Sequence, residues 1–83
     1  MQFKQGDILK LKHDEEFELE NELGELVLKG FPKNTLFKFI NYMDEYDPDY
    51  PEDFNDEYIE IAPLVGRPGD VIYDAYNRHF EKM

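Results

Sequence analysis

The sequence predicts a mainly β fold in one small acidic domain, residues 1–83. Two observations favour strands: apolar and polar residues alternate along several short segments, and clusters of Gly, Pro and Asn separate those segments. A third observation predicts a helix at the C-terminal end: after residue 70 the apolar residues recur every three to four positions instead of every two. Eighty-three residues allow one hydrophobic core and no second domain.

The first two expected elements are extended. In residues 6–12, two leucines share one face of a strand and two lysines share the other. Residues 15–23 place Phe17, Leu19 and Leu23 opposite a row of glutamates. Because this alternation is regular and a glycine follows it, we expect an extended arm or long loop there rather than a helix.

The middle of the chain predicts a hairpin. Apolar runs at residues 26–28 and 36–43 are separated by the turn-forming segment KGFPKN, whose proline has no N–H for a central ladder. Both faces of the second run are partly apolar, as expected of a strand that bends. Residues 58–65 predict a further strand, which Pro63 terminates.

The C-terminal segment predicts a short helix over residues 71–82. One helical stripe would contain Ile72, Ala75, Tyr76, His79, Phe80 and Met83. Asp70 is placed to cap this helix, and Arg78 and Lys82 would lie near its negative end. The β-branched and aromatic residues at 71–73 would also suit a final strand, so that alternative stays open.

Together these elements define the expected architecture. Four to five short strands followed by a short helix suit a small, partly open SH3-like barrel or a twisted antiparallel sheet. The likeness to an SH3-like barrel rests on strand count and chain length, because the sequence carries no motif of a particular family.

Composition argues against several classes of function. Nine basic and twenty acidic residues give a net charge of −11, which repels nucleic-acid backbones and anionic membranes. The lack of Cys removes disulfides, thiolate metal sites and cysteine nucleophiles. The chain has no Ser, and Thr35 is its single Thr, so a hydroxyl-based triad is excluded. We therefore expect no enzymatic activity, no cofactor and no metal site.

The sequence also carries expectations about location and assembly. The N-terminal residues lack the apolar core of a secretory leader, and no run approaches the roughly 18 apolar residues of a membrane span. With the lack of Cys, this favours the cytoplasm of a microbe or of a virus-infected cell. We expect a monomer or weak homodimer that binds neither membranes nor nucleic acid directly.

The most unusual segment, residues 44–60, carries nine carboxylates and no Lys or Arg. Asp47 and Asp49 begin like a calcium-binding loop, but Glu52 stands where that loop needs Gly and Tyr58 where it needs Glu. Two prolines interrupt any helix. The segment therefore predicts an ordered surface connection, with partly buried aromatic rings and exposed carboxylates.

The same carboxylates and Tyr rings predict a surface for a basic partner. The charge is polarised, with −2 through residue 43 and −9 in the rest of the chain. A second acidic row follows the extended arm at a spacing of about 7 Å, close to that of phosphates along a nucleic-acid strand. The candidate partner-binding residues are Asp44, Glu45, Tyr46, Asp47, Asp49, Tyr50, Glu52, Asp53, Asp56, Glu57, Glu16, Glu18, Glu20 and Glu22.

We therefore expect a non-enzymatic protein–protein interaction domain that presents an acidic, Tyr-rich surface to a basic protein. The alternative is a nucleic-acid mimic, for example of viral origin, that inhibits a DNA- or RNA-binding protein. A third alternative is an enzyme that uses one of the many carboxylate pairs, as glycosidases do. The structural alternative gives the carboxylates no partner. In that case the loop is simply solvated, and the glutamate row is the solvent face of an edge strand.

Overall fold

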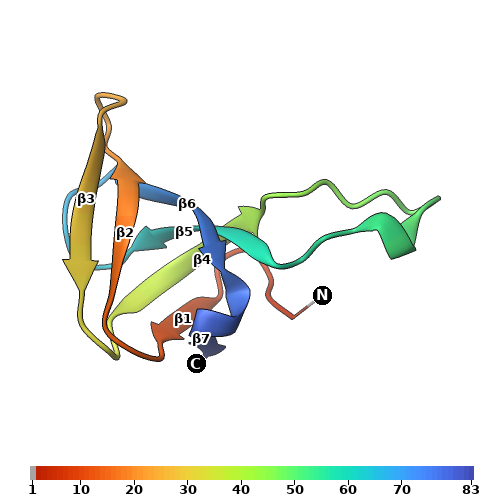
Figure 1. The fold of residues 1–83 in the computed structure, drawn as a ribbon, viewed down its shortest axis with the longest axis horizontal. Coiled ribbons are helices and arrows are strands. Elements are labelled where there is room, and N and C mark those ends of the chain that lie inside the picture. Colours follow the sequence, from red (N-terminus) through yellow and green to blue (C-terminus); the bar gives the residue numbers. More distant parts are fainter. Residues whose placement is uncertain (1) are drawn as a thin grey trace.

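The computed structural model describes residues 2–83, which form seven strands and two 3-10 turns (Figure 1). The strands are β1 (Ile8–Leu11), β2 (Glu15–Glu20), β3 (Leu26–Phe31), β4 (Leu36–Tyr42), β5 (Tyr58–Pro63), β6 (Val71–Tyr76) and β7 (Phe80–Lys82). The 3-10 turns are η1 (Pro51–Asp53) and η2 (Asn77–His79). The predicted mainly β class is confirmed, whereas the predicted count of four to five strands is too low.

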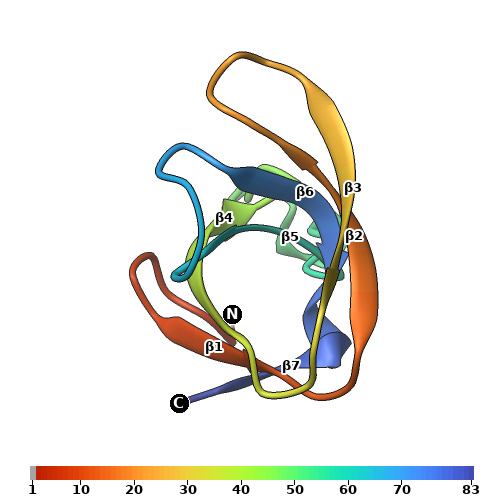
Figure 2. The ribbon, with the colours of Figure 1, turned by 90° about the vertical axis from the view of Figure 1, so that its left-hand side faces the viewer.

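The strands form one antiparallel sheet in the order β3-β2-β6-β5-β4-β1-β7. The sheet curls around its own inner face, as Figure 2 shows, but it does not close, so β3 and β7 remain its edges. In β4 the register shifts between Phe39 and Asn41, an irregularity of the kind that bends a strand. Ile40 lies at this shift and is half-buried, which explains why this run is apolar on both faces.

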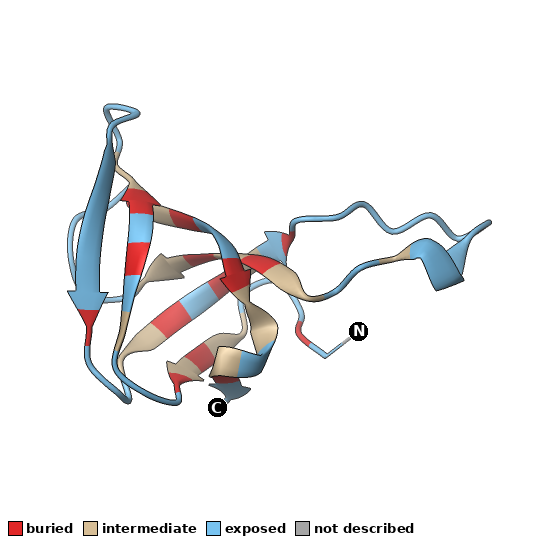
Figure 3. Ribbon diagram, viewed as in Figure 1, coloured by how far each residue is buried: buried red, intermediate tan, exposed pale blue. Residues whose placement is uncertain are grey.

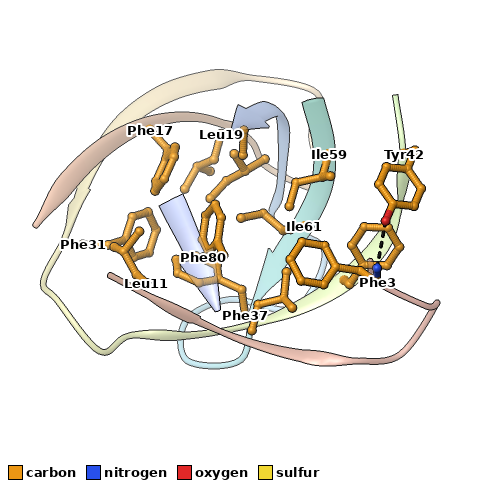
Figure 4. Close-up of a cluster of buried hydrophobic side chains, with 14 residues drawn as sticks. Phe3, Leu11, Phe17, Leu19, Phe31, Phe37, Tyr42, Ile59, Ile61 and Phe80 are labelled. Atoms are coloured by element: carbon orange, nitrogen blue, oxygen red, sulfur yellow. Dashed lines mark hydrogen bonds between the residues drawn. The ribbon is translucent and has the colours of Figure 1, made fainter. Parts of the chain in front are cut away.

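Aromatic rings fill the inside of the curled sheet (Figure 4). Phe37 is fully buried, and the rings of Phe31, Phe80 and Phe17 lie 5.2, 5.5 and 6.1 Å from its ring. The other core residues are Phe3, Leu9, Leu11, Leu19, Phe39, Tyr42, Ile59, Ile61, Ile72 and Ala75. Figure 3 shows buried positions alternating with more exposed ones along β2 and β4, which is the pattern that predicted strands.

Three of the elements expected outside the predicted hairpin are confirmed. β1 and β5 occupy the strands predicted at residues 6–12 and 58–65. β2 occupies the first part of the arm predicted at residues 15–23, and its Phe17 and Leu19 are buried as expected. Because β2 pairs with both β3 and β6, it is an integral strand of the sheet rather than a loose arm.

The apolar runs at residues 26–28 and 36–43 are strands as predicted, in β3 and β4. The predicted hairpin between them is wrong, because β3 pairs with β2 and not with β4. The turn of the actual hairpin lies earlier, where Asn21 Oδ1 accepts the backbone N–H groups of Leu23 and Glu25. This turn carries Leu23 away from the core, so it is exposed instead of facing inward. Only the second half of the KGFPKN segment, residues 32–34, turns the chain, because residues 29–31 belong to β3; this turn leads from the edge strand β3 across to β4.

The predicted C-terminal helix over residues 71–82 is also wrong, since β6, η2 and β7 occupy this segment. An irregularity in β6 explains the misleading period. Asp74 has a φ of 59°. Ile59 and Ile61 of β5 are two residues apart, whereas their partners in β6, Ala75 and Ile72, are three residues apart. Ile72 and Ala75 are therefore both buried at a spacing that imitates a helix. His79, predicted on the helical stripe, ends η2 instead.

Candidate interaction surface

The acidic loop, residues 43–57, joins β4 to β5 and projects away from the curled sheet (Figure 1). Backbone hydrogen bonds fix both of its ends. Met43 donates its N–H to the carbonyl of Tyr58 at 3.0 Å, and Asn77 donates its N–H to the carbonyl of Glu57 at 2.8 Å. The loop therefore leaves the sheet in a defined direction.

Local hydrogen bonds order the interior of the acidic loop. Asp44 Oδ2 accepts the N–H of Asn55 at 2.9 Å and so ties the outgoing arm to the returning arm. Near the tip, Asp47 Oδ1 accepts the N–H of Asp49 at 2.9 Å, and its carbonyl accepts the N–H of Tyr50 at 3.0 Å. These are the turns that Asp and Asn side chains stabilise. The predicted surface connection is therefore a series of hydrogen-bonded turns.

A row of aromatic rings runs from the core into the acidic loop. The buried ring of Tyr42 lies 5.4 Å from that of Phe54, which in turn lies 5.4 Å from that of Tyr46. Phe54 is half-buried and packs on the core, whereas Tyr46 and Tyr50 are 49% and 58% exposed. The prediction of partly buried aromatics is confirmed for Phe54, whereas the two tyrosines expose large ring surfaces to solvent.

The carboxylates of the acidic loop face water, as predicted. All of the acidic residues are exposed except Glu57, which is half-buried and lies 3.9 Å from Arg78. Within residues 2–83, this is the one ion pair that involves a carboxylate of the loop. The loop therefore projects a concentrated negative charge into solvent.

A hollow of about 330 Å³ opens at the base of the acidic loop. Its lining residues are Asn41, Tyr42, Asp44, Glu45, Tyr46 and Phe54. The wall combines two carboxylates with aromatic rings, and these groups attract a cation through its charge and through the electron-rich ring faces. The guanidinium of an Arg or the ammonium of a Lys matches this chemistry.

The second predicted acidic row lies on β2. Because the apolar residues of β2 face inward, the glutamates face outward, with Glu16 and Glu18 exposed and Glu20 half-buried. Glu22 lies in the following turn and does not extend the row. Figure 1 shows β2 and the acidic loop towards opposite ends of the molecule, so the structure does not join the two predicted sets into one surface.

Two tyrosines near these acidic groups have raised pKa values. The hydrogen bond between its hydroxyl and that of Tyr76, 3.2 Å away, raises the pKa of Tyr58 above its ordinary value of 10.0. Desolvation raises the pKa of Tyr73, and the charges of Glu20 and Glu60 raise it further. Both phenols are therefore neutral at physiological pH and keep their hydrogen-bonding protons.

The sequence interpretation missed two groups. Edge strand β3 exposes Leu26 and Leu28 on the face that also carries the β2 glutamates, but a continuous apolar run gives no sign of an edge position. His13, Glu15 and His79 also come together, with ligand atoms all within 4.8 Å of one another, and these side chains could hold a metal ion. Their wide separation in the sequence leaves no motif to recognise.

Comparison of the chain with protein-family models, with curated proteins and with solved structures finds no match in any of the three. Over residues 2–83, no helix has the length and apolar character needed to cross a bilayer. Function is therefore inferred from the geometry and charge of the acidic loop and the sheet.

Proposed function

We propose that this chain is a non-enzymatic interaction domain whose acidic loop binds a basic segment of another protein. The hollow at the base of the loop is the observation that carries this proposal, because it places the carboxylates of Asp44 and Glu45 beside aromatic rings. One Arg or Lys side chain of the partner enters the hollow, and the exposed rings of Tyr46 and Tyr50 cover the neighbouring backbone.

The order of the loop supports this assignment. Hydrogen bonds within the loop hold its turns before any partner arrives, so less conformational entropy is lost on binding than for a disordered acidic tail. The excess negative charge speeds the encounter with a basic surface and makes the association sensitive to salt. The proposal takes the protein as a monomer or weak homodimer, and it does not depend on the finer likeness to an SH3-like barrel.

A pair of charge-matched variants tests the proposal. Asp44→Asn with Glu45→Gln alters the hollow, and Glu16→Gln with Glu18→Gln alters the β2 row; each pair removes two negative charges. Tagged wild type and both variants are used to capture proteins from a lysate of the source cell at low and high salt. We expect the wild type and the β2 variant to retain one partner at low salt, and the loop variant to lose it. Equal loss in both variants, or equal retention, overturns the proposal.

The second candidate function is mimicry of nucleic acid by β2. Glu16, Glu18 and Glu20 point outward from one strand, where same-face neighbours are about 7 Å apart, close to the repeat of a phosphate backbone. Competition with duplex DNA distinguishes the two functions. A partner that is displaced by DNA and lost in the β2 variant supports mimicry, whereas a partner that binds this protein and DNA together argues against it.

A further inference from the structure

The strongest feature outside the acidic loop is a cluster of three potential metal ligands. His13 lies in the turn between β1 and β2, Glu15 begins β2, and His79 ends η2 just before β7. Glu15 Oε2 lies 3.0 Å from His79 Nδ1 and 3.4 Å from His13 Nε2, and all three ligand atoms lie within 4.8 Å of one another. In a tetrahedral zinc site, bonds of about 2.0–2.2 Å place ligand atoms about 3.3–3.5 Å apart. Two of the three separations are already close to this value.

A second observation points to a missing ligand. Glu15 Oε2 and His79 Nδ1 are buried, and neither has a hydrogen-bond partner within residues 2–83. Although these atoms are only 3.0 Å apart, their contact lacks the geometry of a hydrogen bond. Buried polar atoms are normally satisfied. A cation between them would bind both atoms at once.

The backbone around the cluster is held in place. Lys12 donates its N–H to the carbonyl of His79 at 2.9 Å, and Leu11 pairs with Phe80 in the ladder between β1 and β7. Figure 2 shows β7 beside the chain that leads from β1 into β2. Beneath the cluster, the ring of Phe17 stacks on that of Phe80 at 5.9 Å. The β1–β2 turn and the end of η2 are therefore fixed side by side before any ion binds.

The donor set selects the class of metal. Two imidazole nitrogens and one carboxylate oxygen suit a borderline ion such as Zn²⁺, whereas Ca²⁺ and Mg²⁺ prefer all-oxygen sites. The side chain of His13 is 51% exposed, so an ion can reach the cluster from solvent. Three protein ligands leave the fourth tetrahedral position for water or a further donor.

We propose that His13, Glu15 and His79 form a Zn²⁺ site that links the start of β2 to the end of η2. In the sheet, β2 is bonded to β3 and β6, and β7 to β1, so no ladder joins β2 to β7. The bound ion supplies a link across this open seam. The site uses residues outside the acidic loop, so it stands independently of the proposed partner.

Direct observation of the two imidazoles tests the proposal without any variant. The chain contains only two His residues, so long-range proton–nitrogen NMR spectra of untagged, labelled protein resolve both rings. Zn²⁺ is added at about pH 7.5 in the presence of excess Mg²⁺, which occupies surface carboxylates. We expect saturable shifts at Nε2 of His13 and Nδ1 of His79 with one equivalent of Zn²⁺. Spectra in which neither ring shifts, or in which only one His ring shifts, overturn the site.

Calorimetry and thermal melts with three single-site variants complete the test. His13→Ala and Glu15→Gln should each weaken Zn²⁺ binding at least about tenfold and remove the rise in Tm that Zn²⁺ gives the wild type. Glu16→Gln is the matched control, because it removes one charge from the outer face of β2 and should bind Zn²⁺ as the wild type does. Binding that is unchanged in all three variants, or absent from the wild type, leaves only a contact between Glu15 and His79 and overturns the proposal.

Discussion

The curled sheet and the acidic loop use aromatic residues in opposite ways. In the sheet, Phe37 and Phe80 are buried among other rings, where removal of apolar surface from water stabilises the fold. In the loop, Tyr46 and Tyr50 remain exposed among carboxylates, where their rings offer contact area. Stability and the proposed recognition therefore lie in different parts of the molecule.

Order also has a different source in each region. The sheet is held by long-range strand pairing around one core, whereas turns and hydrogen bonds from backbone N–H groups to Asp side chains order the acidic loop. One side chain, Phe54, connects the two, because it packs on the core from within the loop. Changes in the sheet should therefore affect folding, and changes in the loop should mainly affect binding.

The largest expected effect is in the centre of the sheet. Phe37→Ala removes a fully buried ring that contacts three others, and we expect a loss of about 3–5 kcal/mol in the free energy of unfolding, as for other large core aromatics. Urea denaturation followed by circular dichroism measures this change. A loss below about 1 kcal/mol would show that the aromatic cluster does not hold the sheet.

A smaller effect is expected where the loop meets the core. Phe54→Ala should lower the free energy of unfolding by about 1–2 kcal/mol, less than a full core substitution because the ring is only half-buried. Tyr50→Ala is the matched control, since that exposed ring should change stability by less than about 0.5 kcal/mol. Equal losses in the two variants would contradict the anchoring role of Phe54.

The carboxylates of Asp49 and Asp53, which accept no hydrogen bond and form no ion pair within residues 2–83, should contribute little to folding, or slightly oppose it. Asp49→Asn with Asp53→Asn removes like-charge repulsion, so stability should be unchanged or rise by up to about 0.5 kcal/mol. Added salt should raise the Tm of the wild type, because ions screen the excess negative charge. Thermal melts at two salt concentrations measure both effects. A clear loss of stability in the double variant would show that these carboxylates have structural partners.

The smallest effect is expected from Asp7 and appears only in acid. A hydrogen bond from the backbone N–H of Lys4, with a contribution from Lys82, holds the pKa of Asp7 below its ordinary value of 3.8. Since the folded-state pKa is the lower one, the stabilisation is present above the ordinary value and is lost as pH falls through the folded-state pKa. Asp7→Asn should therefore lose less stability than the wild type between about pH 5 and pH 2. Identical acid-unfolding curves would contradict this role.

The alternation of apolar and polar residues predicted where several strands lie but not which strands pair. Alternation correctly placed β1, β2 and β5, because each has one buried face. The partner of β3 depended on whether the turn at Asn21 or the KGFPKN segment closes the hairpin, and both have turn chemistry. The irregularity at Asp74 then gave β6 the period of a helix. One extra residue in β6 was enough to give a strand the apolar spacing of a helix.

The candidate sites also differ in whether the sequence alone predicts them. The acidic loop could be predicted because its residues are consecutive and its charge is visible in the sequence. The separation of the loop from β2 could not, since it depends on the strand order of the whole sheet. The convergence of His13, Glu15 and His79 depends on a contact between the β1–β2 turn and η2. No local signal predicts such a contact.

A loop-shortened variant tests most directly whether recognition and stability are separate. Asp44 and Asn55 are hydrogen-bonded at 2.9 Å, so residues 45–53 can be replaced by a short Gly-Ser linker that leaves Phe54 on the core. Urea unfolding and partner capture are measured on the same preparation. We expect a cooperatively folded protein that no longer retains the partner held by the wild type at low salt. A variant that fails to fold, or one that still retains the partner, would contradict this division of roles.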